Sequence, residues 1–545
     1  MERSDDEAKR PKRADVGAEA DHFSALPDDL IISILVKLRD AAAACKTSVL
    51  ARRWLGLWAQ LPELHFLHAD PDDIRDALNA YRGPELLLLS VVAEDASPES
   101  VSAWLPIAAR RVTGALRFQN SPSPQRGDDY DDDDLALPCF GTAVEILLHL
   151  QVFRLALPAN GVFARLTKLY LFGLRLRGPP CGLGDAVSSP RSPCLKFLSV
   201  IEVWVLDVLT IHSESLEYLL LEELPELQHL VVKAPALREL AVHNCLDNAL
   251  TSTELVAGIS APGLESLMWP NLCNPGSVQL GAMPHLRELA IASFQVYGQD
   301  NTPAMMNRRL MAVLRRFQSL ESLTLSLTYP PDIRTYRFLM GEMGSLPDIT
   351  FLALHVTSCQ HSFGASLSHV LRMCTSIRVL HLYFDAKPEW HKEETVCLSD
   401  CICDEPQKWK TEELVLDGLE EVEIFDFGGT EHEVAVVKPL FCWATVLKRM
   451  KGVMHGLELL KRGAIWRIGT GSQVRIWRDN WLQRSDSLKV SGKKKETRLR
   501  WVSELIKPDT RSWDEDTVRK YFYPHDAEAI LAIKLTQRPS DDFVA

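Results

Sequence analysis

The sequence lacks any hydrophobic run long enough to cross a membrane, because none approaches the roughly 18 apolar residues of a membrane helix. Its first twenty-one residues, MERSDDEAKRPKRADVGAEAD, are too charged for a signal peptide. Cysteine is sparse: the 12 cysteines are spread over 545 residues without a dense framework. We therefore expect reduced thiols and a location in the nucleus, the cytoplasm or both. An excess of positive charge is also missing, and the net charge of -13 argues against general nucleic-acid binding.

A chain of this length holds several domains and buries ample core. Residues 1–20 are expected to be disordered, because they are charged and carry few large apolar side chains. The basic run Lys9-Arg10-Pro11-Lys12-Arg13 fits a nuclear import signal. The same residues are also typical of a solvated basic patch, so both interpretations stay open.

Residues 21–66 contain two short apolar patterns of helical spacing. Pro27 with Asp28 and Asp29 marks a helix start, because proline suits the first turn and carboxylates suit its positive end. The first pattern consists of Leu30, Ile31, Ile34, Leu35 and Leu38, and the second of Val49, Leu50, Trp54, Leu57 and Trp58. Roughly 45 residues cannot bury a large core alone. This segment is therefore expected to leave apolar surface for a partner.

Three blocks of this segment, LPDDLIISIL, TSVLARRWLGLW and LPELHF, follow one another in the order and spacing of the F-box of plant F-box proteins, which they resemble. The resemblance implies a three-helix module that docks on the Skp-type adaptor of a cullin-RING ubiquitin ligase. By position, it implies that the adaptor-binding residues are Leu26, Pro27, Leu30, Ile34, Leu35, Val49, Leu50, Arg53 and Trp54. Arg39-Asp40-Ala41 departs from the family, which usually has proline in that turn. The alternative is an ordinary helical hairpin buried against the rest of the chain.

Residues 67–160 give weaker signals, which we interpret as an irregular start of a repeat region. Leu86 to Val92 and Leu116 to Phe118 are expected to be strands, and Ala103 to Val112 a helix. The segment 120–138 is rich in proline, serine and aspartate, which predicts an exposed loop. Its acidic run either binds a basic partner or a divalent cation, or simply stays solvated.

Residues 161–400 carry an internal repeat of the form L-x-x-L-x-L. Its ten units begin at Leu166, Leu195, Leu216, Leu227, Leu237, Leu264, Leu286, Leu320, Ile349 and Ile377. Period and pattern resemble leucine-rich repeats, in which short parallel strands stack into a solenoid. Where the spacing falls to ten or eleven residues, near Leu230, the returning side is expected to be extended; Ala304 to Phe317 fits a helix. Target binding is expected on the concave strand surface and in loops.

Residues 401–452 resemble the FBD module that follows the repeats in many plant F-box proteins. Leu419, Val422 and Ile424 indicate a strand, and Val434 to Met450 an amphipathic helix that Pro439 is expected to kink. This module is expected to cap the solenoid. Just before and within its start, His391, Cys397, Cys401 and Cys403 suggest metal ligands, but their spacing is not a usual zinc pattern. We therefore predict no metal and no cofactor.

Residues 453–545 hold five of the thirteen tryptophans and the basic run Lys493-Lys494-Lys495. They resemble the region downstream of the polymerase core in plant non-LTR retrotransposon reverse transcriptases. The matching residues are Trp466, Arg467, Gly469, Gly471, Val474, Ile476, Trp477, Asp479, Trp481, Leu482, Leu505, Ile506, Trp513, Phe522, Asp526 and Ile530. No paired catalytic aspartates or Cys/His cluster accompany them, so we expect a fragment without catalytic activity. Its tryptophans either pack a small core or stack on bases.

The sequence thus predicts an α+β chain: a three-helix F-box, an irregular leucine-rich-repeat solenoid with parallel strands, an FBD-like cap and a small Trp-rich α+β tail. The resemblance implies a non-catalytic substrate receptor of a Skp–cullin–F-box ubiquitin ligase, whose partners are a Skp-type adaptor, a cullin scaffold and an unknown target protein. Two other classes stay open. One is a repeat scaffold without a ligase, and the other is a nucleic-acid-binding protein derived from a retroelement.

Overall fold

The computed structural model describes residues 26–49, 52–54, 56–122, 134–151, 153–178, 182–245, 255–270, 275–384, 401–404, 409, 414–454, 466–482, 488–495, 497–533, 535 and 543–544. Several predictions fall outside these residues: the N-terminal tail with its basic run 9–13, Leu50, most of the loop 120–138, His391 and Cys397. Among the described residues, no helix is both long and apolar enough to cross a membrane.

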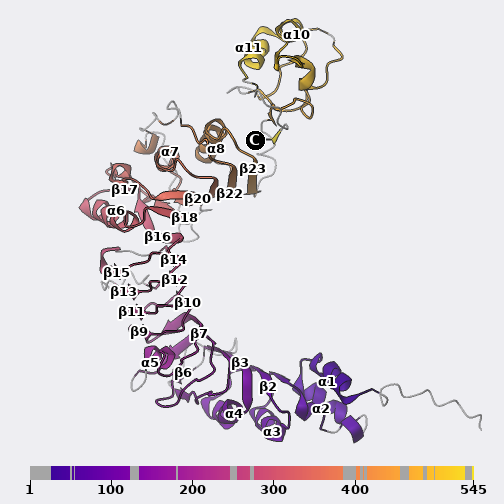
Figure 1. Cartoon of the computed structure of the whole chain (residues 1–545), viewed down its shortest axis with the longest axis vertical. Helices are drawn as coiled ribbons and strands as arrows, with labels where there is room; N and C mark the ends of the chain where they lie inside the picture. The colour runs from indigo at the N-terminus through magenta and orange to yellow at the C-terminus, as the bar shows by residue number, and fades with distance from the viewer. Residues whose placement is uncertain are drawn as a thin grey trace, which may run out of the picture. The chain divides into compact units, whose positions relative to one another are not determined.

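The chain divides into two compact units. The first consists mainly of residues up to Leu237, and the second mainly of residues from Gly263 onward. Both units are built in the same way, from a ladder of parallel strands with helices along one side (Figure 1). The chain is therefore α+β, with the long parallel sheet expected of a leucine-rich-repeat solenoid.

The first unit begins with five short helical elements and continues with the ladder. Its helices are α1 (Asp28–Val36), α2 (Ala41–Lys46), η1 (Thr47–Val49), η2 (Arg52–Trp54), η3 (Trp58–Gln60), α3 (Pro71–Ala80), α4 (Pro98–Arg111) and α5 (Leu183–Val187). Its strands are β1 (Glu63–Leu67), β2 (Leu86–Glu94), β3 (Val112–Ser121), β4 (Asp134–Ala136), β5 (Glu145–Leu150), β6 (Arg154–Ala156), β7 (Lys168–Leu176), β8 (Phe197–Trp204), β9 (Val208–His212), β10 (Tyr218–Glu222) and β11 (His229–Lys233).

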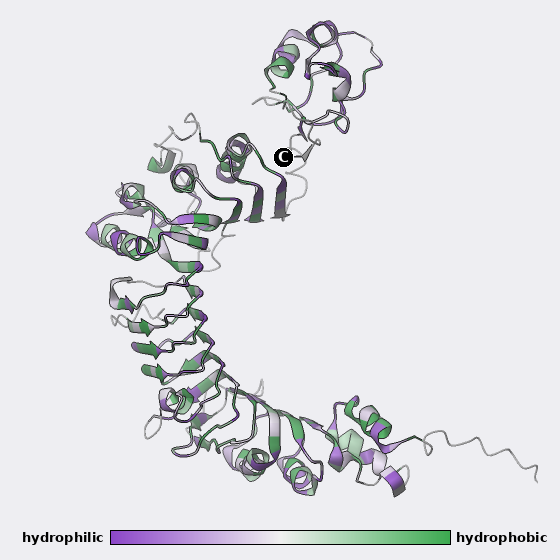
Figure 2. Cartoon of the chain, in the orientation of Figure 1, coloured by the Kyte–Doolittle hydropathy of each residue, from purple (hydrophilic) through white to green (hydrophobic). Residues whose placement is uncertain are grey.

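Strands of the first ladder pair in parallel in the order β1, β2, β3, β5, β7, β8 and β10. Alternate side chains of a strand point to opposite faces, so one leucine set enters the core and the residues between face outward. Leu169 and Leu171, Leu198 and Val200, and Leu219 and Leu221 accordingly share rows and are buried. The predicted strand positions are confirmed here, and Figure 2 shows the apolar residues along the strands.

The returning side of the short repeats is extended, as predicted. β9 pairs in parallel with β11, in a small sheet separate from the ladder. This corrects one repeat unit: Leu230 and Val232 belong to β11 and bury their side chains from the returning side. The L-x-x-L-x-L pattern occurs on both sides because both strands of a two-sided repeat place alternate leucines in the same core.

The second unit continues the repeat pattern. Its strands are β12 (Glu239–His243), β14 (Ser266–Trp269), β15 (Val278–Leu280), β16 (Glu288–Gln295), β17 (Tyr297–Gly298), β18 (Ser319–Thr328), β19 (Arg337–Phe338), β20 (Asp348–Thr357), β21 (Val379–Phe384), β22 (Glu421–Phe427) and β23 (Arg449–Met454), while β13 (Val256–Ser260) is divided between the units. Its helices are η4 (Pro275–Ser277), α6 (Asn301–Leu314), η5 (Met340–Glu342), α7 (Gly364–Met373), η6 (Ile402–Asp404) and α8 (Glu431–Trp443). α6 confirms the helix predicted near Ala304.

The FBD-like region extends this second ladder. The parallel order is β12, β14, β16, β18, β20, β21, β22 and β23, so β22 and β23 add two strands with α8 between them. The predicted helix from Val434 to Met450 is wrong at its end, because α8 stops at Trp443 and Arg449 starts a strand. The apolar spacing suited a helix, but pairing with β22 decides the conformation.

The F-box-like segment (residues 26–66) contains two α-helices and three short 3-10 turns among its described residues. The pattern from Val49 to Trp58 predicted a third helix, and this is corrected to η1, η2 and η3. Gly56 has a φ of 91°, in the left-handed region that a continuous right-handed helix does not allow. The helical stretch is therefore interrupted between η2 and η3.

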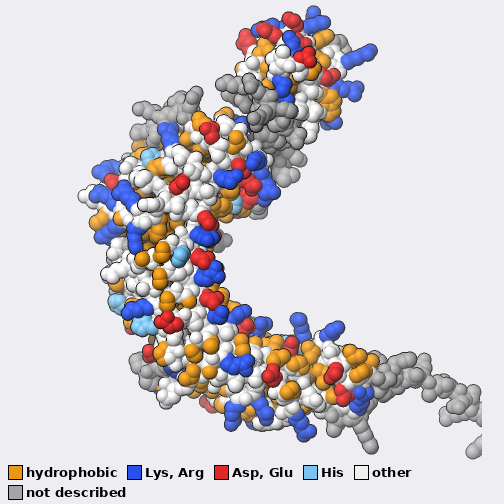
Figure 3. All heavy atoms as spheres, viewed as in Figure 1, with side chains coloured by type: hydrophobic (Ala, Val, Ile, Leu, Met, Phe, Trp, Pro, Cys, Tyr) orange, Lys and Arg blue, Asp and Glu red, His pale blue; other side chains and the backbone are white. Residues whose placement is uncertain are grey.

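Charged residues directly before the strands form ion pairs between neighbouring repeats. In the first unit Lys196 pairs with Glu217 at 2.8 Å, and in the second Arg238 pairs with Glu265 at 2.9 Å. Glu420, before β22, contacts both Arg378 and Lys448, and hydrogen bonds from these two cations lower its pKa. Figure 3 shows acidic and basic side chains next to one another along the second unit. The cations are exposed and the carboxylates partly exposed, so each pair adds little stability.

The C-terminal part of the second unit has a hydrophobic core of its own. Its elements are β24 (Trp466–Arg467), η8 (Val502–Leu505), β25 (Ile506–Lys507), β26 (Ser512–Trp513), α10 (Glu515–Tyr521), α11 (Pro524–Ala532) and β27 (Phe543–Val544). Trp481 and Phe522 are fully buried in this core, and Trp477 stacks on Phe522 with 5.0 Å between the ring centroids. The described residues of the tail therefore form a small α+β core around their aromatic side chains.

Candidate functional site

Helix α1 carries two neighbouring apolar rows with different surroundings. Ile31 and Leu35 are 0% and 2% exposed, and they anchor the helix, which lies against η3. Leu30 and Ile34 on α1, and Leu38 two residues after its end, follow one another at four-residue steps and are 51%, 41% and 45% exposed. We call these three residues the outer row. It is a strip of large aliphatic side chains that the described residues leave exposed.

Other residues predicted to bind an adaptor lie around this helix. Pro27 is exposed and Leu26 half-buried at the start of α1. Val49, in η1, is 87% exposed. Arg53 extends its guanidinium to Asp28, in the first turn of α1, with 2.7 Å between Nη2 and Oδ1. This exposed ion pair links η2 to α1 and contributes little stability by itself.

Two predicted site residues are buried in the chain by itself, so their contact with an adaptor stays a prediction. Leu35 and Trp54 are buried in the core of the F-box-like segment, because its few helices have little else to pack between them. These two side chains pack in the core beneath the outer row. Leu38 was not among the predicted site residues, although its four-residue step from Ile34 could have indicated it.

The turn between α1 and α2 is built without the proline usual in F-boxes. Arg39 adopts a φ of 50°, a left-handed conformation that reverses the chain after α1. Asp40 then caps α2: its Oδ1 accepts hydrogen bonds from the backbone N–H groups of Ala42 at 2.8 Å and Ala43 at 3.1 Å. A capping aspartate thus fixes the angle at which α2 leaves the turn.

Replacing Asp40 by alanine is expected to destabilise α2 by about 1 kcal/mol, because two backbone donors lose their acceptor. Hydrogen exchange of the Ala42–Lys46 amides should then be about fivefold faster than in the parent protein. Asp73→Ala, an exposed first-turn position of α3, is the matched control and should leave these amides unchanged. Equal protection of α2 in both variants would contradict the capping role.

A second surface lies on the outward face of strands β20 to β22. His355, Tyr383 and Phe425 share one row of the ladder and stack face to face, with ring centroids 4.3 Å and 4.4 Å apart. We call these three residues the aromatic row. All three are half-buried, so part of each side chain remains open to solvent. Flat rings held in a row can pack against an apolar or planar group.

The neighbouring row of the same ladder is charged. Glu423 lies between His381 and Lys451, with 3.5 Å between the Glu423 carboxylate and His381 Nε2 and a hydrogen bond from Lys451. The hydrogen bond from Lys451 lowers the pKa of Glu423, while burial raises the pKa of Tyr383 in the row beside it. The surface thus places an aromatic strip beside an ionised carboxylate.

Sequence reasoning placed target binding on the strand surface without naming residues. The signal for the aromatic row was present, since His355, Tyr383 and Phe425 each directly follow a buried aliphatic residue of their strand. A smaller stack occurs in the first unit, where Phe197 and Tyr218 lie 4.4 Å apart on β8 and β10. Alternation alone predicts that such residues face outward, but not that their rings meet.

The tryptophans of the tail serve packing in the structure. Trp481 is buried and donates its indole N–H to the carbonyl oxygen of Ile476, and Trp513 donates to that of Ile533. Trp477 is covered by Phe522 on one side, and Lys493 lies over its ring at 5.5 Å. These rings stabilise the tail, which favours the packing interpretation over base stacking.

No family model matches the chain, but a comparison with curated proteins finds relatives. An F-box/FBD/LRR-repeat protein of Arabidopsis thaliana is 24% identical over 443 residues, which cover 76% of this chain and 85% of that protein. This relative and the two described next are plant proteins named for an F-box and leucine-rich repeats, and two of the three are also named for an FBD. This agrees with the resemblance carried by the three blocks near the N-terminus and by the repeats.

Two further relatives from Arabidopsis thaliana match shorter stretches. A second F-box/FBD/LRR-repeat protein is 27% identical over 253 residues, covering 42% of this chain and 54% of that protein. The F-box/LRR-repeat protein 13 is 24% identical over 226 residues, covering 39% and 48% respectively. The chain thus spans most of the first relative and about half of the other two. The resemblance of residues 453–545 to retroelement proteins stays a prediction.

Proposed function

We propose that the chain is the substrate-receptor subunit of a Skp–cullin–F-box ubiquitin ligase. The observation that carries this proposal is the outer row of α1, because Leu30, Ile34 and Leu38 lie open to solvent in the segment that resembles an F-box. A strip of aliphatic side chains on a small helical unit is stabilised when a partner helix covers it. The names of the curated homologues support the same assignment.

In this role the chain carries out no bond chemistry. The F-box-like segment binds the Skp-type adaptor, the adaptor binds the cullin scaffold, and the repeats hold the target protein. A conjugating enzyme elsewhere in the assembly transfers ubiquitin to a lysine of the target. The receptor contributes by keeping this lysine close to the ubiquitin donor, which raises the effective concentration of the reacting groups.

The direct test is reconstitution of the full chain with a purified Skp-type adaptor and a cullin, followed by size-exclusion chromatography. We expect a complex of all three proteins, with the receptor retained only when the adaptor is present. Binding to the adaptor without recruitment of the cullin would instead indicate a repeat scaffold without a ligase. Absence of adaptor binding by the folded chain would refute the proposal.

We infer that the target binds at the aromatic row of the second unit. Substituting Tyr383 and Phe425 together by alanine removes the centre and one end of the stack. Because aromatic anchors dominate binding energy at interfaces, target recovery should fall about tenfold or more, while adaptor binding stays unchanged. Quantitative proximity labelling in plant cells, normalised to the adaptor recovered with the bait, measures both quantities.

Phe338→Ala is the matched control, since Phe338 is an exposed aromatic residue on β19, outside the aromatic row. A true target is a protein that is labelled by the parent chain, retained by the control and lost by the double variant. If every labelled protein is recovered equally with the double variant, the target does not use this surface.

A further inference from the structure

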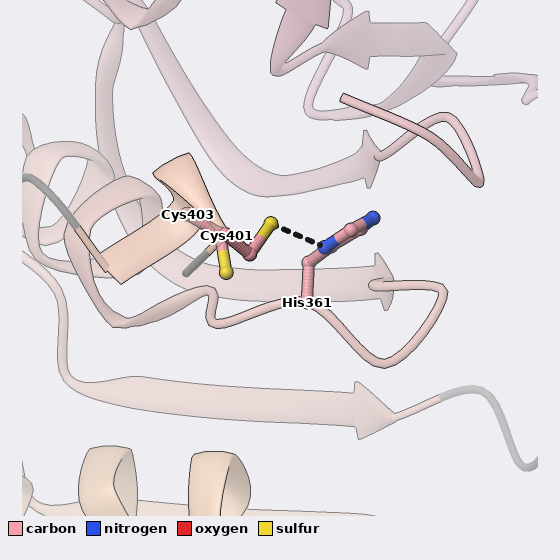
Figure 4. Close-up of side chains that lie close together, drawn as sticks. All are labelled: His361, Cys401 and Cys403. Carbon is pink, nitrogen blue, oxygen red and sulfur yellow. Dashed lines mark hydrogen bonds between the residues drawn. The ribbon is translucent and has the colours of Figure 1, made fainter. Parts of the chain in front are cut away.

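A histidine and two cysteines that are distant in the sequence meet in the second unit. His361 follows β20 and precedes α7. About forty residues later, Cys401 directly precedes η6 and Cys403 lies within it. The three side chains are buried, and their ligand atoms all lie within 4.8 Å of one another. Figure 4 shows the sulfur of Cys401 directed at the imidazole ring, with Cys403 beside it. Among the described residues, this is the one such group of three.

The geometry matches the donor spacing of a tetrahedral zinc site. Zinc bonds of about 2.3 Å to sulfur and about 2.0 Å to nitrogen place these two atoms about 3.5 Å apart when the angle is tetrahedral. The observed distance between Cys401 Sγ and His361 Nδ1 is 3.5 Å. The two remaining pairs, which both involve Cys403 Sγ, lie within 4.8 Å.

The tautomer of His361 also suits a metal ligand. Its Nε2 lies 3.1 Å from the carbonyl oxygen of Pro331. A carbonyl oxygen only accepts, so the ring proton belongs on Nε2 and the lone pair of Nδ1 is directed at the sulfur. A backbone carbonyl that orients the distal N–H is the usual support of a metal-binding histidine.

We propose that His361, Cys401 and Cys403 bind one zinc ion, with water completing the coordination. A hydrogen bond between the Cys401 thiol and the His361 ring would by itself explain why these two side chains meet. It would not explain why the Cys403 sulfur lies in the same group, within 4.8 Å of both, whereas a shared metal ion would. The sequence argued against a metal here, because C-x3-C-x-C is not a usual zinc pattern. His361 supplies the missing donor from another repeat, which no local spacing could indicate.

The ion would attach the segment before the FBD-like cap to the repeat ladder. Cys401 and Cys403 belong to the stretch that leads towards β22, and His361 belongs to the β20–α7 connection. A second contact lies close by: the Trp409 indole covers Gly364 at the start of α7, where any side chain would clash with the ring. Zinc and Trp409 together would fix this stretch against α7. This inference does not depend on the proposed ligase function.

Metal analysis of the full chain tests the proposal. Protein purified with zinc and then dialysed should retain about one equivalent per chain by mass spectrometry, and Cys401→Ser with Cys403→Ser should retain less than about a tenth of that. Cys374→Ser is the matched control: that thiol is buried, and burial raises its pKa to about 12, which disfavours the thiolate that binds metal. His369→Ala is the corresponding control for His361→Ala.

Cobalt substitution gives a readout that needs no variant. The parent chain loaded with Co²⁺ should show the visible absorption of a tetrahedral site and a thiolate-to-cobalt charge-transfer band. Absence of that band in folded parent protein would overturn the proposal even if the cysteine variants fail to fold. Full zinc retention by Cys401→Ser with Cys403→Ser would overturn it as well, because the metal would then lie elsewhere.

Discussion

Replacing Leu30 and Ile34 together by aspartate is expected to weaken binding of a Skp-type adaptor at least about a hundredfold. Both side chains belong to the exposed outer row, so the parent complex would cover them with apolar surface. Two carboxylates in that contact would lose hydration without gaining partners, and each such loss costs several kcal/mol. Isothermal titration calorimetry with the purified adaptor measures the change in affinity.

The fold should survive this double substitution, because neither side chain contributes to the buried core of the F-box-like segment. Val208→Asp, at an equally exposed valine on β9, controls for the added charge and should bind the adaptor like the parent chain. Leu35→Asp is a poor test, since it buries a carboxylate and would unfold α1. Unchanged affinity in a folded Leu30→Asp, Ile34→Asp protein would exclude the outer row as the docking surface.

Substituting Trp104 by alanine is expected to lower the local free energy of unfolding by about 3–5 kcal/mol. Trp104 lies on α4, is 1% exposed and packs edge-on against Phe118 of β3, with 5.1 Å between ring centroids. Its removal leaves a large cavity between this helix and the strand ladder. Hydrogen exchange of the α4 and β3 amides is the suitable measurement, because a chain of two units need not unfold in a single step.

Protection of these amides should fall more than about a hundredfold in Trp104→Ala. Leu87→Ala serves as the control in the same unit: Leu87 is 49% exposed on β2, so its truncation should cost less than about 1 kcal/mol. Similar losses in both variants would mean that the aromatic contact does not hold α4 to the sheet.

The repeat leucines were the most predictable part of the fold. Leu169, Leu198 and Leu219 are buried in parallel rows, as period-2 alternation requires. The spacing of apolar residues was less informative where it fits both a helix and a strand. The spacing of Val437, Leu440 and Leu447 fits a single helix. In the structure Leu447 instead precedes a strand, because the residues that follow it form backbone hydrogen bonds with β22.

Exposure at the candidate site was only partly readable from sequence. Leu30 and Ile31 are adjacent and equally apolar, but the first is exposed and the second fully buried. Which of two neighbouring rows faces inward depends on where η3 lies, a contact between residues that are distant in sequence. The meeting of His361 with Cys401 depends in the same way on the return path of the chain, so no motif could have predicted it.

The ion pairs that precede the strands have a consequence for recognition. Lys196 with Glu217 and Arg238 with Glu265 each form a neutral pair between neighbouring repeats, and Glu420 offsets one of the two cations that contact it. Opposite charges held a few ångströms apart produce a field that decays quickly with distance. The paired charges at these strand ends therefore exert little long-range electrostatic attraction on an approaching protein. Charges within the neutral pairs would therefore contribute little to the rate at which a target approaches, and these positions would act mainly at contact.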